Sequence, residues 1–265
     1  PSHSHAGLWA PALLCLLRLA QGFAVGGQWG ASVIVALEGS DDTNRGRAGA
    51  LVQIGVPGGL LLACAASWAT HSSFGAVAFM SWAWRIPLLL GAILVALTMM
   101  APDPSKAAEA QRATRDDEAG ELSALDVILD NFKPIALVAG MKMLQNAIFY
   151  IYFEYTLLVF AKSTGHTVRL GMFAIACSSA IGLITIPFWA AMSDKWGKKN
   201  VYLFGCVASA LFAIPFFLNL GSGHPLLTVV MIAVGLNGLH DAAYGPQAAL
   251  CAEMFDRRTR LIGIS

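Results

Sequence analysis

The sequence predicts an all-α protein that crosses a membrane several times. Of its 265 residues, 57% are hydrophobic and 12% are charged, whereas an ordinary soluble domain is about 25% charged. The mean hydropathy is +0.63, and the apolar residues gather in segments long enough to cross about 30 Å of hydrocarbon. A net charge of +1 without a basic patch that contains aromatic residues gives no indication of a nucleic-acid partner. The expected surroundings are therefore a lipid bilayer.

A window of about 19 residues marks seven candidate spans, at 8–37, 50–70, 82–101, 134–160, 170–192, 200–220 and 225–254. The stretch from Asp103 to Lys133 is too polar to enter lipid and separates three spans from four. We therefore expect part of an N-terminal bundle (1–101), a cytoplasmic central linker (102–133) and part of a C-terminal bundle (134–265).

Basic residues occur at alternate connections, near 45–47, 106–133, 195–199 and 257–260. By the positive-inside rule these four connections are cytoplasmic. The expected orientation in a cell (plasma or inner) membrane has residue 1 outside and residue 265 in the cytoplasm. The chain opens on Pro1 and stops at Ser265, which we interpret as an internal fragment.

The first span places a cation in a helix that is rich in glycine. At about 100° per residue, one stripe of this helix contains polar residues and a neighbouring ridge contains small ones. Burying Arg in lipid costs at least about 2.5 kcal/mol, so the stripe is expected to face a polar pathway. The ridge is expected to pack closely on another helix; the alternative is an Arg that only pairs structurally with a neighbouring helix. The stripe comprises Arg18, Gln21, Gln28 and Ser32, and the ridge Gly22, Gly26 and Gly30.

Two later spans supply further pathway candidates. The last span has Asn237, His240, Asp241, Tyr244 and Gln247 on one helical face. His240 and Asp241 could hold or pass a proton, or could form a purely structural hydrogen-bond cluster. Gly245 and Pro246 could break this helix and free backbone carbonyls for the solute. The fourth span offers Gln145, Asn146, Tyr150 and Glu154, together with Lys142 and aromatic residues. Amides mixed with aromatics suit a small polar solute, although the aromatics could serve packing, Lys142 could reach toward the surface and Glu154 could form a structural pair.

Charged residues at the predicted cytoplasmic ends are candidates for a gate. These are Glu38, Arg45, Asp194, Lys195, Gly197, Lys198, Lys199, Glu253, Arg258 and Arg260. The spacings of Gly30, Glu38 and Arg45 recur in Gly245, Glu253 and Arg260, a weak internal repeat that favours two related bundles. The five cysteines, Cys15, Cys64, Cys177, Cys206 and Cys251, are scattered singly without metal-ligand spacing. Neither a disulfide, a metal site nor a cofactor is expected.

Several of these segments resemble the major facilitator superfamily, and within it the metabolite:proton symporter family. The segment from Arg18 to Gly30 resembles the family's fourth helix, and Asp194-Lys195-Trp196-Gly197-Lys198-Lys199 resembles its cytoplasmic loop motif. Trp84-Arg85-Ile86-Pro87 and Tyr244-Gly245-Pro246-Gln247 resemble further family segments. The resemblance implies a twelve-helix, two-bundle fold of which this chain holds helices four to ten, with the missing helices of the same polypeptide as partners. It also implies alternating access, a gating role for the loop, and proton-coupled import of an organic acid or zwitterion such as shikimate, a dicarboxylate, 2-oxoglutarate, proline or betaine.

Two departures from the family pattern stand out. Gln28 occupies the place of a usual Glu and cannot carry a proton, and Ala190 replaces the Gly that opens the loop motif. If coupling survives, the remaining intramembrane carboxylates are Glu154 and Asp241. A truncated, non-functional transporter fragment and a polar channel or facilitator without proton coupling remain alternatives. An enzyme is not expected, because no HExxH or GxSxG motif is present.

Overall fold

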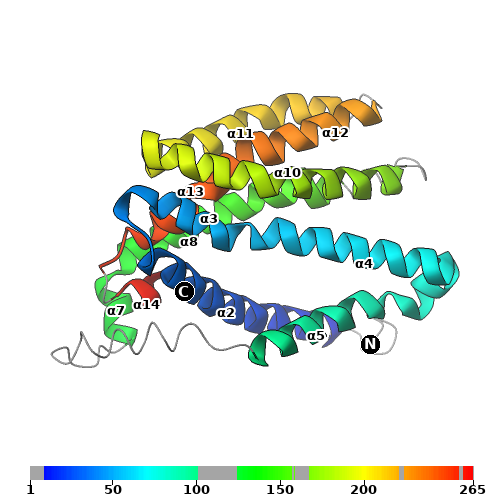
Figure 1. Ribbon diagram of the computed structural model, residues 1–265, viewed down its shortest axis with the longest axis horizontal. Coiled ribbons are helices and arrows are strands. Elements are labelled where there is room, and N and C mark those ends of the chain that lie inside the picture. Colours follow the sequence, from blue (N-terminus) through cyan, green and yellow to red (C-terminus); the bar gives the residue numbers. More distant parts are fainter. Residues whose placement is uncertain are drawn as a thin grey trace.

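The computed structural model describes residues 9–100, 124–156, 158, 167–220, 224–256 and 259–264, and the regular elements in them are all helical (Figure 1). The first group comprises α2 (Trp9–Glu38), the short 3-10 helix η1 (Asp42–Asn44), α3 (Arg45–Gln53), α4 (Gly55–Ala78), the π-helix η2 (Phe79–Ala83) and α5 (Arg85–Met100). The second group comprises α7 (Ala124–Asp130), α8 (Phe132–Tyr150), the π-helix η3 (Ile151–Tyr155), α10 (Thr167–Trp196), α11 (Lys198–Leu220), α12 (Pro225–Ala233), the π-helix η4 (Val234–His240), α13 (Asp241–Ala252) and α14 (Arg260–Ile264).

The helices coincide with the predicted spans, which confirms the all-α membrane class. Five described helical segments are long and apolar enough to cross a membrane: Arg45–Ala83, Phe132–Tyr155, Gly171–Trp196, Lys198–Asn219 and Leu226–Ala252. The two remaining expected spans correspond to the 30-residue α2 and to α5, whose apolar part, Arg85–Thr98, is shorter. The segment Arg45–Ala83 includes a reversal at Gly75, whose φ of 76° lies in the region that favours glycine.

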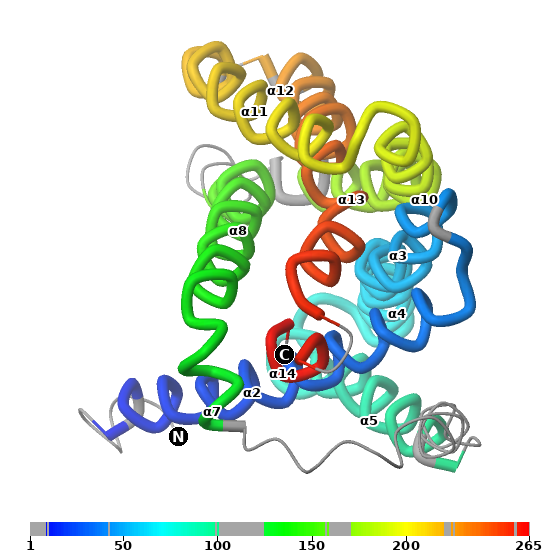
Figure 2. Tube along the Cα trace, turned by 90° about the vertical axis from the view of Figure 1, so that its left-hand side faces the viewer, coloured from blue at the N-terminus to red at the C-terminus, as the bar shows by residue number. Residues whose placement is uncertain are grey.

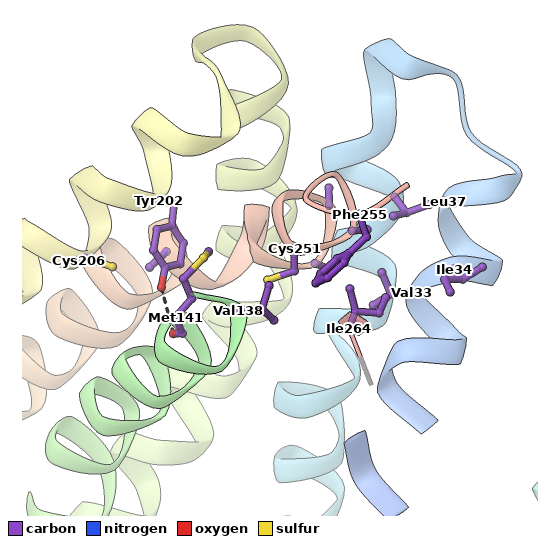
Figure 3. Packing of buried hydrophobic residues seen from close by; sticks show 14 residues of the cluster. Val33, Ile34, Leu37, Val138, Met141, Tyr202, Cys206, Cys251, Phe255 and Ile264 are labelled. Carbon is purple, nitrogen blue, oxygen red and sulfur yellow. Dashed lines mark hydrogen bonds between the residues drawn. The ribbon is translucent and has the colours of Figure 1, made fainter. Parts of the chain in front are cut away.

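Helix α13 lies at the centre of the packing. It contacts α11, α3 and α10 along its length (Figure 2). A large apolar cluster surrounds its C-terminal half, with Val33 and Leu37 from α2, Met141 from α8, Tyr202 from α11 and Cys251 from α13 itself (Figure 3). Burial of such side chains stabilises the bundle by about 1.5–3 kcal/mol each where water is the alternative.

Glycines allow these helices to approach closely. A Cβ atom on Gly205 of α11 would lie 2.4 Å from the backbone nitrogen of Ala243 in α13. A Cβ atom on Gly245 would lie 2.8 Å from the carbonyl oxygen of Ile186 in α10. Small residues at both interfaces bring backbone against backbone, as membrane helix pairs commonly do.

The helix break that Gly245 and Pro246 could have caused is absent from α13. Helix α13 runs through Pro246 without interruption, because a proline removes only one backbone donor and a packed membrane bundle tolerates that loss. The irregular backbone lies immediately before α13, in the π-helix η4. π-helical turns inside α-helices often occur at functional sites.

The connections rich in charge meet at one end of the molecule. The start of α3, the turn between α10 and α11 and the segment after α13 lie together at the left of Figure 1, whereas the reversal between α4 and α5 lies at the opposite end. This arrangement agrees with the alternation of basic connections along the chain. Which end faces the cytoplasm stays a prediction.

Candidate functional site

A cavity of about 570 Å³ lies between α2, α4, α8, α10 and the continuous helix formed by η4 and α13. Its size is typical of pockets for small molecules, which range from about 300 to 1,000 Å³. Apolar and aromatic side chains form most of its wall, and polar groups converge from α8, α10, η4 and α13. Seven of the predicted pathway residues line it: Gln145, Asn146, Tyr150, Asn237, His240, Asp241 and Tyr244.

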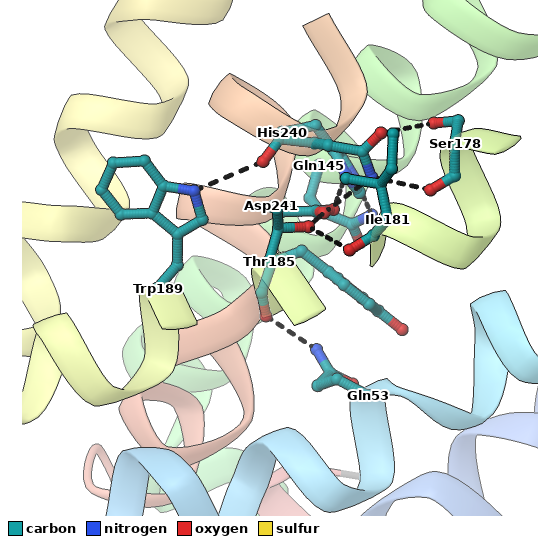
Figure 4. A network of polar contacts seen from close by, with 10 residues as sticks. Gln53, Gln145, Ser178, Ile181, Thr185, Trp189, His240 and Asp241 are labelled. Carbon is teal, nitrogen blue, oxygen red and sulfur yellow. Dashed lines mark hydrogen bonds and ion pairs between the residues drawn. The ribbon is translucent and has the colours of Figure 1, made fainter. Parts of the chain in front are cut away.

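Asp241 is the acidic group of this cavity and is almost fully buried, with 4% of its surface exposed. Its Oδ2 atom accepts hydrogen bonds from the hydroxyl of Thr185 and from Nδ2 of Asn237. Its Oδ1 atom lies 3.2 Å from Nδ1 of His240 (Figure 4). A buried carboxylate needs such partners because desolvation penalises its charge. The arrangement holds an acid and an imidazole in contact inside the membrane-spanning region.

His240 connects Asp241 to α8. Its Nε2 atom lies 2.8 Å from Nε2 of Gln145, and its ring stacks on Tyr244 with 5.3 Å between ring centroids. An amide nitrogen only donates, so in this orientation Nε2 of His240 accepts and Nδ1 carries the proton that faces Asp241. That pattern describes a neutral imidazole beside a carboxylate. A doubly protonated imidazole would require the Gln145 amide to turn its oxygen toward Nε2.

Helix α10 supplies partners that sequence reasoning missed. The hydroxyl of Ser178 donates to Oδ1 of Asn237, whose Nδ2 donates in return to the carbonyl oxygen of Ser178. Thr185 donates to Asp241, and Nε1 of Trp189 donates to the backbone carbonyl of Asn237. Ser178, Thr185 and Trp189 recur at positions i, i+7 and i+11 of α10 and so share one helical face. That spacing is the signal that could have identified them.

A second frame of hydrogen bonds joins α2 and α3 to α13. Nε1 of Trp29 donates to Oε1 of Gln53, and Nε2 of Gln53 donates to the backbone oxygen of Tyr244 at 2.9 Å. Gln53 is fully buried, so both ends of its amide are used where water is excluded. This frame orients the indole of Trp29 in the cavity wall.

Aromatic rings and one lysine form the wall on the side of α8. Phe149 stacks on Phe153 with 5.0 Å between ring centroids and also contacts His240. The ammonium of Lys142 lies 3.5 Å from the centre of the Trp29 ring. Apolar rings next to a few polar groups are typical of sites for small polar solutes.

The polar stripe of α2 lies away from the cavity, contrary to expectation. The glycine ridge faces it instead, through Gly22 and Gly26. Burial of Val33 and Leu37 in the apolar cluster and the hydrogen bond from Trp29 to Gln53 together set the rotation of the helix. The side chains of the stripe are exposed in the described part of the chain, where Nη1 of Arg18 donates to Gln21 and the Ser32 hydroxyl donates to the backbone oxygen of residue 28. A pathway role for Arg18, Gln21, Gln28 and Ser32 stays a prediction.

The two remaining pathway candidates also lie outside the cavity lining. Glu154 is exposed on η3. Gln247 is fully buried one turn beyond Tyr244, and its Nε2 donates to the backbone oxygen of Met141 at 3.3 Å. Gln247 therefore connects α13 to α8 outside the cavity lining. A direct contact between Gln247 and the solute stays a prediction.

The predicted gate centres on Asp194 at the end of α10. Its two carboxylate oxygens accept hydrogen bonds from the backbone N–H groups of Gly46 and Arg47, at 2.8 and 3.2 Å. These N–H groups belong to the first turn of α3. N–H groups in the first turn of a helix have no acceptor within that helix, and this end of the helix carries a partial positive charge. Lys198 lies 3.8 Å from Asp194 and 2.9 Å from Glu253. The cluster joins the ends of α3, α10, α11 and α13.

Two glycines of neighbouring helices lie close to the backbone of Ala190, one turn before Asp194. A Cβ atom on Gly46 would lie 2.7 Å from the carbonyl oxygen of Ala190, and one on Gly245 would lie 3.1 Å from its backbone nitrogen. Gly46 and Gly245 thus allow α3 and α13 to approach the backbone of α10 closely at this position.

The other gate candidates that the structure describes lie at the same end of the molecule as Asp194. Lys195 and Lys199 are exposed, Gly197 forms the α10–α11 turn with a φ of 89°, and Arg260 donates to the backbone oxygen of Phe255. Glu38 and Arg45 lie at the connection between α2 and α3, and Arg258 is outside the described residues. Their part in a gate stays a prediction.

Membrane-spanning helices that surround a largely apolar cavity with a few polar groups define a multi-pass membrane protein, and the comparisons with known proteins give its family. The model of the Major Facilitator Superfamily matches residues 5–265. The chain belongs to this superfamily, as its sequence motifs predicted.

Curated relatives match along essentially the whole chain. A Haemophilus influenzae protein named as a candidate for metabolite transport is 33% identical, with 100% of this chain and 62% of the relative covered. The shikimate transporter of Escherichia coli is 27% identical over 99% of this chain and 61% of its own length. The alpha-ketoglutarate permease of the same species is 28% identical over 100% and 60%. The chain thus spans about 60% of the length of these relatives; no solved structure gives a significant match.

Proposed function

We propose that this chain carries the central part of a secondary active transporter, which imports a small polar metabolite together with protons by alternating access. The proposed location is the cell (plasma or inner) membrane, with residue 1 outside and residue 265 in the cytoplasm. Membership of the superfamily and the cavity of about 570 Å³ between the helices support this proposal. The proposed activity is transport and not catalysis.

The observation that carries the proposal is the buried contact between Asp241 and His240 in the cavity wall. A carboxylate in a membrane-spanning helix is costly and is a candidate for a functional role. Asp241 is held by groups from its own helix and from α10, so a relative movement of these helices would change its partners. A change of partners between two states is what lets an acid bind a proton on one side and release it on the other.

The proposed solute carries a carboxylate. Relatives are named for shikimate, for alpha-ketoglutarate (2-oxoglutarate) and for proline and betaine, and each of these solutes is a carboxylate or a zwitterion with a carboxylate. The aromatic and amide groups of the wall suit molecules of this size. Shikimate, 2-oxoglutarate and proline are therefore the probe solutes for the experiments below.

The contacts of Asp194 support the alternating-access part of the proposal. Bonds from its carboxylate to the first turn of α3 join the two halves of the chain at one end of the cavity. Charge-assisted contacts of this kind can hold one end closed and then separate as a unit. In the proposed cycle they hold the cytoplasmic end closed while the outer end is open.

Uptake into proteoliposomes tests this function, with the protein expressed from its complete coding sequence. Under an inward proton gradient, the wild type is expected to accumulate at least one probe solute above its equilibrium level. Asp241→Asn keeps the size of the side chain but cannot ionise. This variant is expected to lose accumulation and to keep exchange of labelled for unlabelled solute.

Asp130→Asn is the matched control, because it removes an exposed carboxylate of α7 that belongs to no candidate site, and it is expected to accumulate solute like the wild type. Equilibration without accumulation by the wild type would instead indicate a channel or facilitator. Full accumulation by Asp241→Asn would remove Asp241 from the coupling mechanism.

A further inference from the structure

Lys142 lies at the middle of its membrane span. The segment Phe132–Tyr155 has 24 residues, and Lys142 follows Phe132 by ten positions, which is about 15 Å along the helix. A lysine near a helix end can extend its ammonium to the lipid headgroups, but Lys142 is far from both ends. An ionisable group at this depth requires a polar partner inside the protein.

The structure gives Lys142 an aromatic neighbour but no carboxylate. Its ammonium lies 3.5 Å from the centre of the Trp29 ring, and among the described residues no Asp or Glu oxygen lies within ion-pair distance of it. A cation–π contact contributes about 0.5–2 kcal/mol but leaves the three N–H donors of the ammonium without an acceptor. The cation therefore has free donors toward the cavity that it lines.

The acid of the cavity does not need Lys142. Asp241 already accepts hydrogen bonds from Thr185 and Asn237 and lies against His240. Among the described lining residues, the anion is thus fully partnered and the lysine is not. This asymmetry leaves room for one more negative charge, on the side of the cavity formed by α2 and α8.

We propose that Lys142 binds the carboxylate of the transported solute. This inference rests on the proposed function and assigns the binding residue for the acid group. Gly22 and Gly26 have no side chains to fill the space beside Trp29, so a carboxylate can reach the ammonium there. Gln145 lies one helical turn from Lys142 on the same face and continues the polar contact toward His240.

The charges of the site give a reason for binding solute and proton together. Lys142 and an ionised Asp241 sum to zero, and a solute with a single carboxylate and no cation, such as shikimate, makes the site negative by one. A proton on the pair of Asp241 and His240 restores neutrality. Because an uncompensated charge is costly where water is excluded, each ligand favours the other.

Binding measurements on the purified protein test the assignment without any gradient. Each probe solute, shikimate, 2-oxoglutarate or proline, is compared with the corresponding carboxamide by calorimetric titration. The wild type is expected to bind at least one carboxylate about tenfold more tightly than its amide, as loss of a charge-assisted bond predicts. Lys142→Gln is expected to abolish this preference while its affinity for the amide stays within about twofold.

Two further variants separate charge recognition from folding. Lys142→Arg keeps the cation and is expected to retain the preference for the carboxylate. Lys133→Gln removes an exposed cation from the same helix and is expected to bind like the wild type. A purely structural role of Lys142 would weaken carboxylate and amide equally.

The inference is overturned if Lys142→Gln keeps the preference for the carboxylate, or if the wild type binds none of the three probes. A different result would contradict the proposed function. Binding that depends on Lys142, in a wild type that never accumulates solute, would leave the carboxylate site in place and remove proton-driven transport.

Discussion

At the scale of single residues, Gln53 shows how one amide can orient a wall of the cavity. It is fully buried, and it connects Trp29 in α2 to the backbone of Tyr244 in α13. Tyr244 in turn stacks on His240. The positions of the indole and of the imidazole therefore both depend on a residue that does not line the cavity.

Replacing this amide is expected to destabilise the protein. In Gln53→Leu, Nε1 of Trp29 loses its acceptor and the backbone oxygen of Tyr244 loses its donor. An unsatisfied buried polar group costs about 1–3 kcal/mol. Thermal unfolding in detergent measures the effect, and the exposed Gln28→Leu is the control with an expected change near zero. Equal unfolding temperatures for wild type and Gln53→Leu would contradict the role assigned to this amide.

At the scale of helices, the approach of α11 to α13 depends on the absence of one side chain. A Cβ atom on Gly205 would meet backbone atoms of Ala242 and Ala243, at 2.9 and 2.4 Å. Backbone cannot move aside as the end of a flexible side chain can. The close packing of these two helices is therefore specific to glycine at this position.

Gly205→Ala is expected to separate α11 from α13 and to lower stability by about 1–3 kcal/mol, the usual cost of overpacking. Gly140→Ala is the matched control, because a Cβ atom there would meet no atom of the described structure within 4 Å. In an open helical position, alanine is favoured over glycine by about 1 kcal/mol. Gly205→Ala should therefore lower the monodisperse yield and the unfolding temperature, whereas Gly140→Ala should raise both.

The same scale shows what the sequence could predict. Hydropathy and length predicted helices at all seven expected spans, and five of the described helical segments are long and apolar enough to cross a membrane. The polar face of Asn237, His240, Asp241 and Tyr244 lines the cavity, as its spacing indicated. The orientation of α2 could not be predicted, because a helical pattern shows which residues share a face but not which face meets a neighbour. Burial of Val33, Ile34 and Leu37 in the apolar cluster sets that orientation, together with the hydrogen bond between Trp29 and Gln53, 24 positions apart.

At the scale of the whole molecule, the contacts around Asp194 join the two halves of the chain. Its carboxylate takes the place of a helix cap for α3, since Asn44, at the cap position, makes no hydrogen bond from its side chain. Lys198 then connects the same carboxylate to Glu253. The motif from Asp194 to Lys199 predicted a charged cluster at the α10–α11 turn. It could not predict that Asp194 binds the first turn of α3, because Gly46 lies 148 positions away in the sequence.

Removing this cap is expected to open the end of the molecule. In Asp194→Ala, the amides of Gly46 and Arg47 lose their acceptor, and a lost cap costs about 0.5–2 kcal/mol. Hydrogen–deuterium exchange in the peptide that covers residues 42–50 should become faster. Lys199→Ala, which removes an exposed charge from the same turn, should leave this exchange unchanged. Unaltered exchange in Asp194→Ala would show that the first turn of α3 is held by other contacts.

The π-helix η4 gives the last span one residue more than a regular helix of the same length would hold. Winding it into a regular α-helix would turn the segment before it by about 100° relative to the segment after it. Asn237 would then lose its position beside Asp241, while α13 and its contacts with α3 and α11 could stay in place. A deletion of one residue between Val234 and His240 would therefore rotate α12 about the helix axis and leave α13 in place. The two halves of this span can thus turn relative to each other at η4.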